Sequence, residues 1–102
     1  MSGFDVRNVP TRTFECTFLN DAGSTYTLHL TAPSLAVFNR LTTIKGDTSL
    51  DEFYQLMAEA MSFNTEGIKV DQSIFDRMTS DQLQAFEYAY IDWIQNYRKL
   101  KN

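Results

Sequence analysis

Residues 11–31, TRTFECTFLNDAGSTYTLHLT, contain two segments in which apolar and polar side chains alternate. The apolar face of these segments consists of Phe14, Cys16, Phe18, Tyr26, Leu28 and Leu30. Alternation with a period of two, rich in threonine and aromatic residues, is typical of half-buried β-strands. Residues 20–24, NDAGS, lie between the segments and have the composition of a hairpin loop. The sequence therefore predicts a β-hairpin over residues 11–31.

A hairpin of two strands is only marginally stable in water, so later parts of the chain must cover its apolar face. A first helix is predicted after Pro33 and is expected to stop at Gly46. Its apolar residues recur at three-residue steps and are Leu35, Phe38, Leu41 and Ile44.

A second helix is predicted to begin at Ser49, which forms a potential capping box with Glu52 three residues later. Its apolar face consists of Leu50, Phe53, Met57 and Ala60, widened by Tyr54 and Met61. Residues 62–70 are mostly polar, contain Gly67 and are predicted to form a loop. Asp71 is then expected to cap a short turn that contains Ile74, Phe75 and Met78.

The last helix has the clearest pattern in the chain and is predicted to run from about Ser80 to about Leu100. Thr79 and Gln82 have the spacing of a second capping box at its start. Apolar residues recur at steps of three and four along its whole length: Leu83, Phe86, Tyr90, Trp93, Tyr97 and Leu100, widened by Ala89 and Ile94. This heptad-like seam indicates an amphipathic helix with one continuous apolar face.

These elements predict an α+β fold in which an N-terminal hairpin packs against three to four helices. The length of 102 residues fits a single domain, residues 1–102. Within it we expect a loose arm over residues 1–10, the hairpin over 11–31 and a helical part over 33–102. Phe4 and Val6 alternate in the arm, so a third, short edge strand is an open alternative.

The chain carries a net charge of −4, with ten acidic and two basic residues between positions 47 and 96. Because binding to phosphate backbones depends on basic side chains, we expect no nucleic-acid partner. The longest apolar runs span only a few residues, far fewer than the roughly 20 of a membrane helix, so no membrane partner is expected. No N-terminal secretion signal is recognisable, which favours a cytoplasmic location.

The residues that catalysis most often uses do not come together in this pattern. Cys16 and His29 fall on opposite faces of the predicted hairpin, as a core residue and a solvated strand residue respectively. The acidic residues do not follow a metal-ligand spacing, and no glycine-rich phosphate loop is present. We therefore expect no enzyme activity, no catalytic residue, no metal and no cofactor.

Tyrosine and tryptophan are concentrated in the last helix, and these amphipathic side chains favour interfaces. The seam is also longer than two strands of about 23 Å need for cover. We therefore predict a partner-binding surface made of Phe86, Tyr90, Trp93, Tyr97 and Leu100, with its surplus chiefly in the half from Trp93 to Leu100. The alternative is that the whole seam covers the protein's own hairpin.

The order of elements resembles that of the small tail assembly chaperones of long-tailed phages that infect Gram-positive bacteria. The likeness begins near residue 12 and rests on the threonine-rich hairpin, APSL at 32–35, NTEGI at 64–68 and MTSDQL at 78–83, which leads into the aromatic last helix. The resemblance implies a protein that binds the tape-measure protein and helps recruit tail-tube subunits in the host cytoplasm. It also implies absence from the finished virion and no catalytic residues, and it leaves a homo-oligomer open.

Two other functions remain open at this point. The acidic segment is also compatible with an inhibitor or adaptor that occupies a basic groove on a host nucleic-acid enzyme, with Asp47, Asp51, Glu52 and Glu59 as the residues to neutralise. A tail-completion protein that stays in the virion is the third alternative.

Overall fold

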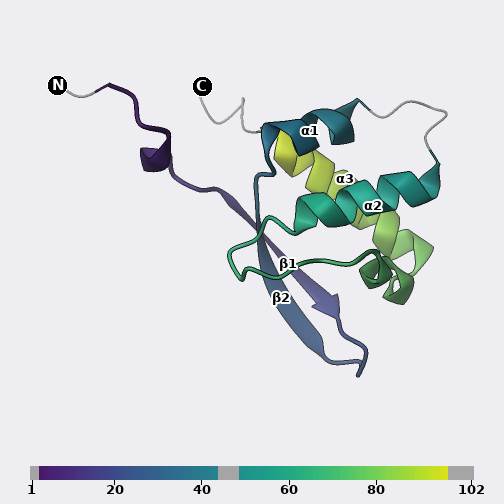
Figure 1. The fold of residues 1–102 in the computed structure, drawn as a ribbon. Helices are drawn as coiled ribbons and strands as arrows, with labels where there is room; N and C mark the ends of the chain where they lie inside the picture. Colours follow the sequence, from purple (N-terminus) through teal and green to yellow (C-terminus); the bar gives the residue numbers. More distant parts are fainter. Residues whose placement is uncertain (1–2, 44–48, 97–102) are drawn as a thin grey trace.

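The computed structural model of the chain describes residues 3–43 and 49–96, which form a two-stranded antiparallel hairpin followed by helices (Figure 1). The elements in order are η1 (Val6–Asn8), β1 (Thr13–Leu19), β2 (Thr25–Thr31), α1 (Leu35–Thr42), α2 (Leu50–Met61), η2 (Gln72–Arg77) and α3 (Ser80–Gln95), where η denotes a 3-10 helix. This arrangement confirms the predicted α+β class.

The hairpin has the predicted strands and a turn built around Asn20. Its register places Cys16 opposite Leu28 on the buried face and Glu15 opposite His29 on the outer face. The Asn20 side chain accepts hydrogen bonds from the main-chain N–H groups of Ala22 at 2.9 Å and of Ser24 at 3.0 Å. Gly23 adopts a φ of +83°, a conformation that glycine reaches without steric cost. Local turn chemistry therefore sets the register.

The N-terminal arm does not add the third strand that the alternation of Phe4 and Val6 suggested. It forms η1 instead, because the Asp5 carboxylate accepts hydrogen bonds from the N–H and the guanidinium of Arg7 and stabilises a local turn. The free edge of β2 is partly covered by residues 63–66, which were predicted as a loop. There Thr31 donates to the Phe63 carbonyl at 2.8 Å, and Thr65 donates to the His29 carbonyl at 3.0 Å.

Helices α1 and α2 begin as predicted, but their first apolar residues face outward. Ser34 and Ser49 cap the two helices through their side-chain oxygens. Leu35 and Leu50 are 71% and 70% exposed, whereas Val37, unassigned by the three-residue pattern, is buried. In α1 the three-residue step drifts away from the 3.6-residue period of an α-helix, and it therefore misplaces Leu35 at the end of the apolar face. The predicted stop of α1 at Ile44 and Gly46 lies outside the described residues.

At Ser49 only half of the predicted capping box forms. The Ser49 hydroxyl accepts a hydrogen bond from the Glu52 N–H at 3.1 Å. The Glu52 carboxylate accepts from the Ser49 hydroxyl, and not from the Ser49 main-chain N–H as in a complete box. The box at Thr79 and Gln82 is complete, with the Gln82 side chain accepting from the Thr79 N–H at 3.0 Å. The start of α3 is therefore held by two reciprocal hydrogen bonds.

The core lies between the inner face of the hairpin and the helices, which gather on one side of it (Figure 1). Asp71 caps η2, and the predicted turn residues Ile74 and Phe75 are buried there. Buried apolar residues come from every main element and include Leu28, Leu30, Leu41, Met57, Met61, Ile74, Phe75, Tyr90 and Ile94. Ala89, expected to widen the seam of α3, is exposed, and the predicted end of the helix near Leu100 lies outside the described residues.

Candidate functional site

The first three residues of the predicted partner-binding surface pack against the protein's own hairpin. Tyr90 is 0% exposed, and its ring stacks on Phe86 with 5.5 Å between centroids. Phe86 also meets Phe18 edge to face at 5.5 Å. Trp93 stacks on Phe14 at 5.6 Å. In this fold the seam of α3 as far as Trp93 therefore covers the protein's own sheet. Trp93, which was expected in the surplus half of the seam, belongs to this cover.

The last two predicted residues, Tyr97 and Leu100, lie outside the described residues. Partner binding at the end of α3 therefore stays a prediction. Within the described part of α3, the well-exposed aromatic ring is Tyr88, which is 69% exposed and does not belong to the predicted seam.

Arg12 joins the root of the arm to the last turn of α3. Its guanidinium lies 4.4 Å from the centroid of the Trp93 ring, a cation–π contact. The same group donates from Nη1 to the main-chain carbonyl of Trp93 at 3.2 Å, an acceptor at the helix end that the macrodipole makes more attractive to a cation. The Trp93 indole therefore contacts both Phe14 on the hairpin and Arg12.

An apolar groove opens beside this contact. It has a volume of about 1070 Å³ and lies between the end of the arm, the β2–α1 connection, α1 and the last turn of α3. Its apolar lining includes Val9, Pro10, Leu35, Phe38 and Ile94. We call this feature the arm–α1 groove. Its size and lining are typical of a site that receives apolar side chains.

The arm leading to the groove leaves large apolar side chains in solvent. Phe4 is 85% exposed, Val6 73% and Val9 51%. The arm extends away from the body of the molecule (Figure 1), and the radius of gyration is 15.0 Å, compared with about 13 Å for a compact domain of 100 residues. The arm and the Leu35 side of the groove together form a surface whose apolar side chains are exposed.

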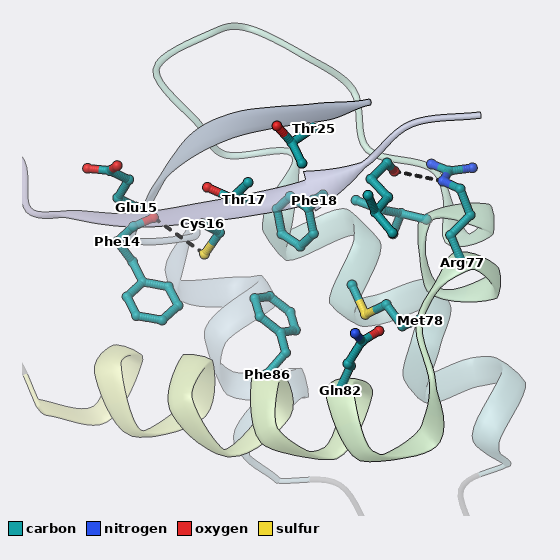
Figure 2. A pocket seen from close by; sticks show the side chains of 12 residues that line it. Phe14, Glu15, Cys16, Thr17, Phe18, Thr25, Arg77, Met78, Gln82 and Phe86 are labelled. Carbon is teal, nitrogen blue, oxygen red and sulfur yellow. Dashed lines mark hydrogen bonds between the residues drawn. The ribbon is translucent and has the colours of Figure 1, made fainter. Parts of the chain in front are cut away.

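A second, smaller hollow of about 390 Å³ runs along β1. Figure 2 shows Phe14, Cys16 and Phe18 pointing from β1 toward α3, where Phe86 and Gln82 point back at them. At one end Arg77 donates from Nε to the Leu19 carbonyl at 2.8 Å and pairs with Asp21 at 2.7 Å. This hollow, the β1 hollow, therefore follows one edge of the sheet.

Cys16 and His29 lie on opposite faces of the hairpin, as predicted. Burial raises the pKa of the Cys16 thiol to about 12, so the thiol is protonated at neutral pH and is a poor nucleophile. His29 binds Glu66, with 2.7 Å between Nδ1 and Oε2, and lies 3.8 Å from Glu15. The hydrogen bond to Glu66 raises the pKa of His29, and bonds from His29 lower the pKa of Glu66 to about 2. The pair ties residue 66 to β2.

Among residues 3–43 and 49–96, no group of three or more His, Cys, Asp or Glu side chains is arranged to hold a metal ion. None of the helices in this part of the chain combines the length and apolarity of a membrane span. Comparison with known proteins found no matching family, no similar characterised protein and no similar solved structure.

Proposed function

We propose that this chain is a non-enzymatic phage tail assembly chaperone that binds the tape-measure protein and assists assembly of the tail tube. The resemblance in layout motivates the proposal. The observation that carries it is the arm–α1 groove together with the exposed apolar residues of the arm. A chaperone needs such a surface because a client's apolar side chains must be covered until the client assembles.

The client would lay an apolar segment into the arm–α1 groove, and the arm would close over it with Phe4 and Val6. Removal of apolar area from water supplies the binding free energy, at roughly 25 cal/mol per Å². Ordering the arm costs conformational entropy, which keeps the complex reversible. Reversibility suits a protein that acts in the host cytoplasm and leaves before the virion is finished.

The test compares two leucines of matched exposure on different surfaces. Leu35 lines the arm–α1 groove and is 71% exposed, whereas Leu50 at the start of α2 is 70% exposed and lies outside the groove. We expect Leu35→Ser to weaken binding to purified tape-measure protein of the same phage about tenfold, a loss of about 1.4 kcal/mol. Leu50→Ser should bind as the natural chain does. Equal affinities of all three chains would contradict the groove as the client site.

A separate measurement tests whether the chain acts during assembly and is absent from the finished virion. Mass spectrometry of purified virions should not detect the chain, while a pull-down from infected cells should recover the tape-measure protein. A chain retained in virions in stoichiometric amounts would instead support a tail-completion protein.

The competing function, an acidic inhibitor of a host nucleic-acid enzyme, has weaker support. Two of the carboxylates that it would use are engaged within the protein: Asp51 accepts from Gln55 and Gln72, and Glu59 pairs with Arg40 at 2.9 Å. Asp47 lies outside the described residues. Neutralising Asp51 and Glu59 should leave client binding unchanged under the chaperone proposal. An inhibitor would instead bind its target enzyme more weakly after this change, and its binding would also weaken as salt is added.

A further inference from the structure

The two edges of the sheet differ in how they are protected. The main-chain N–H of Asn20 donates to the Ser24 carbonyl at 2.8 Å. Because hydrogen-bonded pairs alternate along an antiparallel ladder, the even-numbered residues of β1 form the hydrogen-bonded pairs with β2. The N–H and C=O groups of the odd-numbered residues therefore point away from the partner strand, toward the outer edge of each strand. On β2, those of His29 and Thr31 are engaged by residues 63–66.

On β1 most of the corresponding groups are open. Of the outward-pointing main-chain groups on this strand, the Leu19 carbonyl is bound by Arg77. In the part of the chain that the structure describes, the main-chain groups of Thr13, Glu15 and Thr17 make no hydrogen bond outside the β1–β2 pair. An uncovered strand edge is a template for pairing with another strand.

We propose that the β1 edges of two copies of this chain pair antiparallel about Cys16, giving a four-stranded sheet in the order β2-β1-β1-β2. The proposal concerns an edge distinct from the arm–α1 groove and does not depend on the client-binding function.

The outward hydrogen bonds restrict the register. Odd-numbered residues must face odd-numbered residues, so a two-fold axis passes through a residue of β1 rather than between two residues. An axis at Glu15 would place two carboxylates directly opposite each other, which is destabilising. An axis at Cys16, the midpoint of Thr13–Leu19, places Glu15 opposite Thr17 of the second copy, so the open main-chain groups of these two residues pair with each other.

The same register matches the two faces of the sheet. On the inner face Phe14 meets Phe18 of the second copy and Cys16 meets Cys16, so apolar residues face apolar residues. On the outer face Glu15 meets a threonine. The β1 hollow borders this edge of the sheet. The dimer would end at its two β2 strands, whose edges are partly covered by residues 63–66, and this favours a closed pair over a growing fibre.

Two proline substitutions on directly paired residues test the proposal. Thr17 and Thr27 are opposite each other and share a hydroxyl–hydroxyl hydrogen bond of 3.1 Å. Each substitution therefore removes that bond and one outward N–H, but on different edges. By analytical ultracentrifugation we expect the natural chain and Thr27→Pro to be dimers and Thr17→Pro to be a monomer. A monomeric natural chain, or equal effects of the two prolines, would overturn the proposal.

One measurement on the natural chain does not depend on a variant folding. Amide exchange at Glu15 and Thr17 should slow about tenfold or more as concentration rises through the dimer transition, while exchange at Thr27 should not change. Exchange at Glu15 and Thr17 that does not depend on concentration would overturn the proposal.

Discussion

The guanidinium of Arg12 lies 4.4 Å from the centroid of the Trp93 ring and donates to the main-chain carbonyl of the same residue. One side chain thus joins the end of the arm, just before β1, to the last turn of α3. Because Trp93 also stacks on Phe14, this contact completes the aromatic cover of the hairpin.

Replacing Arg12 with methionine should lower the free energy of unfolding by about 1–2 kcal/mol, because a cation–π contact and a charged hydrogen bond are both lost. Methionine retains an aliphatic stem of similar length. Arg12→Lys keeps a cation over the ring and should lose less. Urea denaturation followed by circular dichroism measures the change, and a methionine variant as stable as the natural chain would show that the contact contributes nothing.

Trp93→Ala should destabilise the fold by about 2–4 kcal/mol, since it removes a ring packed on Phe14 and Tyr90. Tyr88→Ala is the matched control, because Tyr88 lies on the same helix, is 69% exposed and should change stability by less than about 0.5 kcal/mol. Thermal or urea unfolding distinguishes the two. Loss of client binding in Trp93→Ala therefore cannot be assigned to a contact with the client unless the variant is shown to be folded.

Tyr90→Phe should be neutral or should stabilise the protein by up to about 1 kcal/mol. The Tyr90 hydroxyl is buried and has no hydrogen-bond partner in the described part of the chain, so its desolvation is not compensated. Phenylalanine preserves the stacking on Phe86. A loss of more than about 1 kcal/mol in urea denaturation would reveal a hydrogen bond to the hydroxyl in solution.

The contact between His29 and Glu66 should be strongest between about pH 4.5 and 6.5. The pKa of His29 is raised from 6.5, so its contribution is complete below that value and is lost as pH rises through the folded-state pKa. The pKa of Glu66 is lowered from 4.5 to about 2, so its contribution is complete above 4.5 and is lost as pH falls toward 2.

The observable is amide exchange at Thr65, which donates to the His29 carbonyl. Its protection, corrected for the intrinsic exchange rate, should peak in that interval in the natural chain and lose the peak in Glu66→Gln. An NMR titration should give a His29 pKa above 6.5. A value at or below 6.5 would contradict the pair.

The hairpin, the helix starts and the buried turn at Ile74 and Phe75 could be predicted because their signals are local. Period-two alternation, capping side chains and turn residues act within a few positions of where they stand. The outward position of Leu35 and Leu50 could not be predicted in the same way. Both are the first residue of a helix, where apolar spacing alone does not define which side faces the core.

For the candidate site, sequence patterns do not reveal what covers an apolar face or which distant segments come together. The spacing of Phe86, Tyr90 and Trp93 indicates an apolar face, but not whether the chain's own sheet or a partner covers it. The arm–α1 groove went unpredicted because Val9, Leu35 and Ile94 belong to segments far apart in sequence. The pairing of residues 63–66 with β2 was hidden for another reason: main-chain hydrogen bonds leave little trace in side-chain identity.

The separation of 81 positions between Arg12 and Trp93 also imposes an order of events during synthesis. The hairpin leaves the ribosome before the helix that shields its aromatic face has been translated. Until then the nascent chain displays Phe14 and Phe18 on an uncovered strand, which is the kind of surface that aggregates or recruits cellular chaperones. A premature stop before Trp93 would leave a chain that cannot finish this cover and that proteases would remove.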